Sequence, residues 1–162
     1  MTKKQLEVIA THFRQAIVDA KKEGAFDHRD RMSRFPHGCC DDTADLFAHY
    51  LFCEYGLVSN RVNGVYYDGN PENSCSHSWL ELDGMVIDLT GSQFKYDPVF
   101  LNYDYDVYVG RMDKFHELFE IEYKQQSRGI KGLGDSCQNR MYVLYETIVQ
   151  YLAGQSVNEA AL

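Results

Sequence analysis

Residues 76–90 read SHSWLELDGMVIDLT, and this stretch decides the fold that the sequence predicts. Asp83 and Gly84 form the dipeptide that is favoured in two-residue β-hairpin turns, and strand-forming residues flank them on both sides. A turn at this position sets which residues of the two strands face each other. The predicted pairs are Leu82 with Met85, Glu81 with Val86, Leu80 with Ile87, Trp79 with Asp88, and His77 with Thr90.

The register of this hairpin assigns each side chain to one of two faces, because successive residues of a strand point to opposite sides. One face is wholly apolar and is predicted to be buried; it carries Leu80, Leu82, Met85, Ile87 and Leu89. The other carries His77, Trp79, Glu81, Val86, Asp88 and Thr90. His77 and Asp88 become diagonal neighbours about 7–8 Å apart along the backbone, so their side chains can reach each other for a hydrogen bond.

Two helices are predicted before the hairpin. Residues 1–20 have apolar side chains at helical spacing, and Gly24 is a stop signal for this helix. A second helix is predicted over residues 39–56, with Asp41 and Asp42 in the first turn, where acidic groups complement the exposed N–H groups. Cys40 therefore lies at or beside the N-terminus of this helix.

The remaining elements are predicted from shorter signals. Strands are expected over residues 61–69 and 106–110, and a helix over about 113–125. The stretch RGIKGLGDS, residues 128–136, lacks the Gly-Lys-Ser/Thr ending of a phosphate-binding loop and is interpreted as a flexible loop before a last helix. The sequence thus predicts one α+β domain over 1–162, with N-terminal helices packed on an antiparallel sheet and a C-terminal helix closing the core.

Composition excludes several classes of partner. The chain has 16 basic and 24 acidic residues, a net charge of −8, so nucleic acid and anionic membranes are not expected to bind. No apolar run approaches the roughly 20 residues that cross a bilayer, and the N-terminus is amphipathic and unlike a signal peptide. The five cysteines are an odd number, so most are expected to be free thiols in a cytoplasmic protein.

Three residues could form a nucleophilic site. Cys40, at a helix N-terminus, gains a lowered thiol pKa from the unpaired N–H groups. His77 can act as the base and as the acid toward a leaving amine, and Asp88 can accept the other ring N–H and fix the tautomer. Asp41 and Asp42 oppose this arrangement, because negative charges next to the thiol raise its pKa. No metal or cofactor is required by this chemistry.

The segments FPHGCCDDTADLF (35–47), SHSWLELDGMVIDLT and the following Gln-Phe at 93–94 resemble the transglutaminase-like branch of the papain-like cysteine superfamily. The resemblance is greatest to small bacterial proteins with a Gly-x-Cys helix start, then His-x-Trp-x-Glu, then Ile-Asp. It covers residues 35–94 and implies a papain/transglutaminase-like core, with Cys40 as nucleophile, His77 as base and Asp88 as the orienting carboxylate. No counterpart of the superfamily's side-chain oxyanion donor lies upstream of Cys40, so the second donor beside the Cys40 N–H is unassigned.

Further residues are candidates for binding substrate. Trp79 is implied to pack beside the histidine, and Glu81 lies on the same face of the hairpin. Cys39 is a neighbour and rival of Cys40, and the family spacing favours Cys40 as nucleophile. His37, close to the cysteines, could line the site or lie in a surface loop. The other four histidines, at positions 12, 28, 49 and 116, are expected to be structural or surface residues.

The sequence predicts a cysteine-dependent acyl-transfer enzyme that acts through a thioester at Cys40 on an amide of a peptide or protein substrate. Hydrolysis gives an amidase, peptidase or deamidase, and transfer to an amine gives a transglutaminase; the absence of evident calcium loops favours hydrolysis. Two alternatives stay open. One is a non-catalytic binding module on the same fold, and the other is a metal site built from Cys40, Cys75 and His77.

Overall fold

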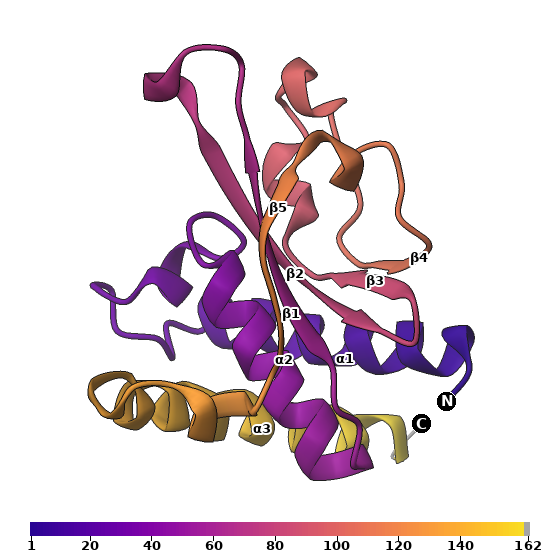
Figure 1. Cartoon of the computed structure of the whole chain (residues 1–162). Helices are drawn as coiled ribbons and strands as arrows, with labels where there is room; N and C mark the ends of the chain where they lie inside the picture. Colours follow the sequence, from indigo (N-terminus) through magenta and orange to yellow (C-terminus); the bar gives the residue numbers. More distant parts are fainter. Residues whose placement is uncertain (161–162) are drawn as a thin grey trace.

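The computed structural model describes the backbone of residues 1–160, in which three α-helices pack with a five-stranded antiparallel sheet (Figure 1). The helices are α1 (Lys3–Lys22), α2 (Cys40–Tyr55) and α3 (Asp135–Ala160). The strands are β1 (Asn60–Tyr66), β2 (Cys75–Leu82), β3 (Met85–Asp88), β4 (Tyr108–Gly110) and β5 (Glu120–Gln126), in the order β4-β3-β2-β1-β5. This arrangement confirms the predicted α+β class. None of the helices in the described part of the chain is both long and apolar enough to cross a membrane.

The hairpin of β2 and β3 has the predicted turn and register. Asp83 and Gly84 have φ values of +50° and +76°, the left-handed conformation that a two-residue hairpin turn of this kind requires at both positions. The ladder pairs Leu80 with Ile87, Glu81 with Val86 and Leu82 with Met85. The alternation of faces that follows from this register therefore holds along both strands.

The apolar face of the hairpin packs against the helices. Leu80, Ile87 and Leu89 belong to a core that includes Phe13 of α1 and Phe47 of α2. In Figure 1 all three helices lie in the lower half of the view, on this side of the sheet. Burial of these side chains, each roughly 1.5–3 kcal/mol, is what fixes the hairpin on the helical layer.

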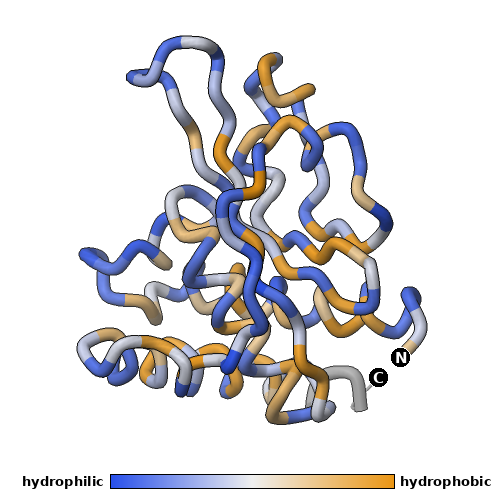
Figure 2. Tube along the Cα trace, in the orientation of Figure 1, coloured by the Kyte–Doolittle hydropathy of each residue, from blue (hydrophilic) through white to orange (hydrophobic). Residues whose placement is uncertain are grey.

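The opposite face of the sheet is also covered. The parts of residues 91–119 on either side of β4 fold over this face as short 3-10 turns and loops, at the upper right of Figure 1. A second apolar cluster forms there, and it consists of Val62, Trp79, Val86, Phe94, Phe100, Tyr103, Phe115 and Phe119. Figure 2 shows that hydrophobic positions continue into this segment, while the projecting connection between β1 and β2 is mainly hydrophilic. The polar residues of this face, His77 and Asp88 among them, are therefore enclosed.

The helix predicted over residues 113–125 is wrong. The chain forms a short 3-10 turn at His116–Leu118 and then β5, which pairs antiparallel with β1. Glu, Lys and Gln in this stretch favour helix locally, but the free edge of β1 supplies a ladder partner that local propensity does not register. β5 is exposed along its whole length, so it has no buried face that would require apolar residues at alternate positions.

Candidate active site

Cys40 is the first residue of α2, as the sequence predicts. Its side chain is half-buried, whereas the preceding Cys39 is fully buried in the core between the helices and the sheet. The N–H groups of the first helical turn have no partner within the helix, so this end of α2 carries partial positive charge. Such a position favours a thiolate over a thiol.

His77 and Asp88 meet on the enclosed face of the hairpin. His77 Nε2 lies 2.7 Å from Asp88 Oδ2, and both side chains are fully buried. Because Nε2 is engaged by Asp88, Nδ1 is the ring atom of His77 left to interact with the Cys40 thiol, and the charges of Cys40 and His77 act on each other. The predicted contact between the histidine and the carboxylate of the hairpin is therefore confirmed.

The electrostatics of this cluster favour an ion pair. Burial by itself would raise the pKa of the Cys40 thiol, but the hydrogen bond and the charge of His77 outweigh it, so the pKa is lowered. Burial by itself would lower the pKa of His77, but the charge and hydrogen bond of Asp88 and the contact with Cys40 raise it. A lowered thiol pKa beside a raised imidazole pKa is the condition for a thiolate–imidazolium pair.

The two acidic residues that follow Cys40 differ in their effect. Asp42 is buried and binds the guanidinium groups of Arg31 and Arg140, so its charge is balanced. Asp41 has a longer contact with Arg31, at 3.7 Å, and its charge still acts to raise the pKa of Cys40. His77 outweighs this opposition.

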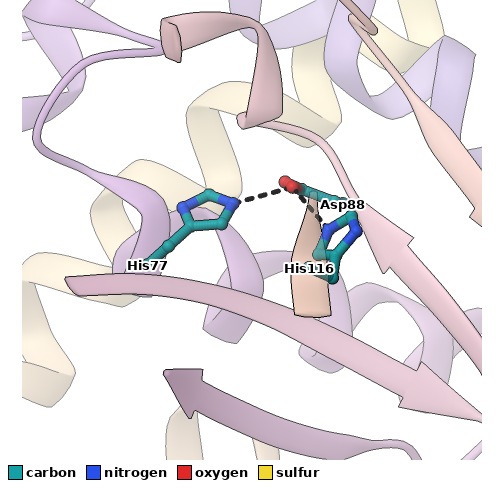
Figure 3. Close-up of side chains that lie close together, drawn as sticks. All are labelled: His77, Asp88 and His116. Carbon is teal, nitrogen blue, oxygen red and sulfur yellow. Dashed lines mark hydrogen bonds and ion pairs between the residues drawn. The ribbon is translucent and has the colours of Figure 1, made fainter. Parts of the chain in front are cut away.

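His116, which the sequence predicts only as a structural or surface residue, is a buried part of the site. Its Nε2 lies 3.1 Å from Asp88 Oδ2, and its Nδ1 lies 2.6 Å from Asp113 Oδ1. Figure 3 shows the rings of His77 and His116 both joined to the Asp88 carboxylate that lies between them. The sequence carries no signal for this contact, because His116 lies in a segment that the sequence predicts as a helix, 28 residues from Asp88, and no turn or register links the two.

The side chains of His77, Asp88 and His116 have potential metal-ligand atoms that all lie within 4.8 Å of one another. Two ligands bound tetrahedrally to one zinc ion at about 2.0–2.1 Å would lie roughly 3.3 Å apart. The His77 Nε2 to Asp88 Oδ2 distance of 2.7 Å is shorter than this and matches a charge-assisted hydrogen bond. Cys40 and Cys75 belong to no such group among the described residues, so the alternative metal site of Cys40, Cys75 and His77 is not formed.

Trp79 lies beside the histidine, as the resemblance implies. Its side chain is almost fully buried, and its ring centroid is 5.9 Å from that of His77. The imidazole is further enclosed by the rings of Phe94, Phe115 and Phe119, with centroids 5.2, 5.7 and 5.6 Å away. This aromatic shell excludes water from the pair of His77 and Asp88, which strengthens their electrostatic interaction.

The other three candidates for substrate binding, Cys39, His37 and Glu81, lie away from the cluster around His77. Burial raises the pKa of the Cys39 thiol to about 12, and the side chain packs in the core, where it has no exposed surface for a substrate. His37 is exposed in the turn before α2. Glu81 is ion-paired with Lys124 of β5. Neither His37 nor Glu81 has a contact with the cluster around His77 among the described interactions.

Gln93 is a polar side chain beside Nδ1 of His77, the ring nitrogen that does not contact Asp88. Its Nε2 lies 3.4 Å from His77 Nδ1 and donates to the Thr90 carbonyl oxygen at 3.1 Å. Gln93 is in the 3-10 turn Gly91–Phe94, directly after the hairpin. The bond to Thr90 uses one of its two N–H groups, so the other is available beside His77 Nδ1.

Comparisons with known proteins add little to this geometry. No protein-family model matches the chain, and no curated protein matches it significantly. One solved crystal structure, of a genomics target, is similar with a TM-score of 0.46 and 9% identity, over 91% of this chain and 78% of that one. A similarity this distant carries no argument about function.

Proposed function

We propose that this chain is a cysteine-dependent acyl-transfer enzyme that acts on an amide of a peptide or protein. One observation carries the proposal: Cys40 at a helix N-terminus, with its thiol pKa lowered by His77, which in turn binds the buried Asp88. A nucleophile, a base and a group that orients the base are the three parts that this chemistry needs.

The proposed reaction has two steps. Cys40 Sγ attacks the carbonyl carbon, a C–S bond forms, and the tetrahedral intermediate collapses with cleavage of the C–N bond as His77 Nδ1 gives its proton to the leaving nitrogen. Water or an amine then attacks the thioester carbon, loses a proton to Nδ1, and the C–S bond breaks. The proton returns to the Cys40–His77 pair, and Asp88 stabilises the imidazolium throughout.

The developing oxyanion needs donors beside the sulfur. The backbone N–H of Cys40, at the free end of α2, is one. The amide of Gln93, 3.4 Å from His77 Nδ1, is the side-chain donor that fits the second position. The hydrogen bond to the Thr90 carbonyl oxygen fixes the orientation of the Gln93 amide before substrate binds. A preorganised donor of this kind stabilises an oxyanion effectively.

The acceptor and the compartment are parts of the same proposal. We favour water, and hence an amidase, peptidase or deamidase. Transfer to an amine, as in a transglutaminase, needs the same triad and stands as the alternative. A reducing compartment such as the cytoplasm fits five cysteines that are all unpaired. The resemblance to transglutaminase-like proteins supports the proposal through the segments that contain Cys40, His77 and Asp88.

The first test is the pH dependence of iodoacetamide alkylation, followed for each cysteine by mass spectrometry in the wild type and in His77→Ala. Cys40 should react quickly down to about pH 6 and lose this property in the variant. Cys53 and Cys137 are exposed thiols of the same chain and serve as internal controls. A Cys40 that titrates near the ordinary value of about 8.5 would contradict the proposal.

The second test separates hydrolysis, transfer and mere binding. The protein is mixed with p-nitrophenyl acetate, and the acetyl group should appear on Cys40 as a thioester, with Cys40→Ala as the blank and Cys53→Ala as the matched control. Decay of the thioester that is unaffected by a primary amine indicates hydrolysis. Faster decay with formation of the amide indicates transfer. Absence of acylation on an intact thiol would favour the non-catalytic binding module.

A further inference from the structure

The second imidazole on Asp88 has a defined place in the site. His116 Nε2 contacts the same carboxylate oxygen as His77, and its side chain is fully buried. We propose that His116 is a positioning residue that, as a doubly protonated cation, holds Asp88 in the orientation and charge state that His77 requires. This inference rests on the proposed function, because it concerns the same triad.

Donors on both oxygens fix the Asp88 carboxylate. Oδ1 accepts bonds from the backbone N–H of Thr90 at 2.9 Å and from its hydroxyl at 3.3 Å. Oδ2 accepts bonds from His77 and His116. A carboxylate held by several donors on both oxygens has one orientation that satisfies them all, and His116 supplies the donor opposite His77.

The hydrogen bonds of His116 define its protonation. Both ring nitrogens face carboxylate oxygens, and an ionised carboxylate only accepts hydrogen bonds. Each nitrogen therefore carries a proton, and the ring is a cation. Burial by itself would lower the pKa of His116, but the hydrogen bonds to Asp113 and Asp88 raise it. Charges then alternate from Asp113 through His116, Asp88 and His77 to Cys40.

Other titratable groups around His116 come from several elements. Tyr103 donates its hydroxyl to Asp113 at 2.8 Å, and Tyr108 of β4 has its ring centroid 5.5 Å from that of His116. Burial raises the pKa of both phenols, so they stay neutral at neutral pH. The charge of Asp88 acts to raise the pKa of Arg14 of α1, but the ion pair of Arg14 is with Asp106. Among the described residues, His77 and His116 are the cations in contact with Asp88.

The cation has a consequence for His77. The two imidazole centroids are 6.3 Å apart, and a positive charge at that distance makes a proton easier to lose. His116 therefore limits the rise in the pKa of His77 that Asp88 produces. A histidine that must give its proton to a leaving group and take one back works best when its pKa is close to the ambient pH. His116 thus positions Asp88 and keeps His77 able to exchange its proton.

Three variants separate these effects in the full chain. His116→Phe keeps a ring in the aromatic shell but removes the donor to Asp88. His116→Gln keeps a donor but removes the charge. Asp113→Asn keeps His116 in place while removing the carboxylate that holds it protonated. His28→Gln, at an exposed histidine, is the matched control.

The measurements are the pH profile of Cys40 alkylation by iodoacetamide and the NMR titration of the His77 ring, neither of which needs a known substrate. His116→Phe should lower the alkylation rate at pH 6 about tenfold or more, and His116→Gln should recover most of it. His116→Gln and Asp113→Asn should each raise the pKa of His77 by about 0.5–1 unit. His28→Gln should leave both readouts unchanged.

The outcomes distinguish this inference from the function on which it rests. If wild-type Cys40 is activated but the folded His116 variants and Asp113→Asn match it in both readouts, His116 is a packing residue and the inference is overturned while the triad stands. If wild-type Cys40 reacts no faster than Cys53 at pH 6, the proposed function fails and this inference with it. If His116→Phe does not fold, the His77 titrations of the other two variants decide.

Discussion

Arg140 of α3 holds Asp42 of α2 with two hydrogen bonds, in which Nη2 lies 2.7 Å from Oδ2 and Nη1 lies 3.2 Å from Oδ1. The same guanidinium binds both oxygens of Asp30, at 2.7 and 2.9 Å. Asp42 follows Cys40 by two residues, so its charge would raise the pKa of the Cys40 thiol if it were unbalanced. The C-terminal helix therefore contributes to the site through charge as well as packing.

Replacement of Arg140 by Met tests this contribution. Loss of the guanidinium removes the cation that Asp30 and the buried Asp42 share, so the free energy of unfolding should fall by about 2–4 kcal/mol. The pH at which Cys40 becomes reactive should rise by roughly half a unit, because Arg31 still balances part of the Asp42 charge. Urea denaturation and cysteine-specific alkylation measure the two effects. Arg29→Met, at an exposed ion pair, is the control and should change neither.

The wild-type pH profiles should differ between alkylation and turnover. The pKa of Cys40 is lowered by His77 against the effect of burial, and the pKa of His77 is raised by Asp88 against the effect of burial. Below the Cys40 pKa the sulfur is protonated and both rates fall. Above the His77 pKa the thiolate remains, but the acid that protonates the leaving group is lost. Alkylation should therefore show one acidic limb and amide turnover a bell-shaped profile; a bell-shaped alkylation profile would argue against the pair.

Part of the site could be predicted because a local signal determined it. The Asp83-Gly84 turn fixes the hairpin register, and that register alone brings His77 and Asp88 to one face. Cys40 could be placed at a helix start because Asp41, Asp42 and the apolar stripe that follows are typical of one. These are contacts within an element or between neighbouring strands, where spacing along the chain specifies distance.

The remaining parts depend on contacts that spacing does not encode. His116 reaches Asp88 because the chain after β4 turns back over the second face of the sheet, a long-range contact that no local pattern predicts. β5 forms because the edge of β1 is free, although its residues favour a helix. The burial of Cys39 beside a half-exposed Cys40 depends on the rotation of α2 against the sheet, which the apolar stripe defines only approximately.

Gly91 is required by the close packing around Asp88. A Cβ at this position would lie 2.9 Å from Asp88 Oδ2 and 2.7 Å from the ring of Tyr103. Because Asp88 is held by hydrogen bonds on both oxygens, it cannot move without loss of its contacts. Gly91→Ala should slow Cys40 alkylation at pH 6 about tenfold and lower the free energy of unfolding by about 1–3 kcal/mol.

Gly154→Ala is the control for this substitution, because a Cβ at that position of α3 meets nothing within 4 Å. It should leave Cys40 unchanged and stabilise the helix by about 0.5–1 kcal/mol. Alkylation and thermal unfolding of both variants provide the comparison. A Gly91→Ala protein with wild-type reactivity would mean that the position of Asp88 does not control the Cys40–His77 pair.

Gln93→Ala separates stabilisation of an oxyanion from activation of the thiol. Iodoacetamide is attacked at a saturated carbon and develops no charge on a carbonyl oxygen, whereas formation of a thioester does. If the Gln93 amide, 3.4 Å from His77 Nδ1, donates to that oxygen, its loss should slow acylation of Cys40 by p-nitrophenyl acetate about 100-fold and leave alkylation unchanged. Gln15→Ala, on the exposed surface of α1, is the matched control.

The two rates measured together give each result a distinct meaning. Equal losses of acylation and alkylation would show that Gln93 acts by holding His77 through its contact with Nδ1. Unchanged rates for both would place the second oxyanion donor elsewhere, with the backbone N–H groups at the start of α2 as the remaining source. A selective loss of acylation assigns the role to Gln93, because a side chain that only supported the thiolate–imidazolium pair would affect both reactions of the same sulfur.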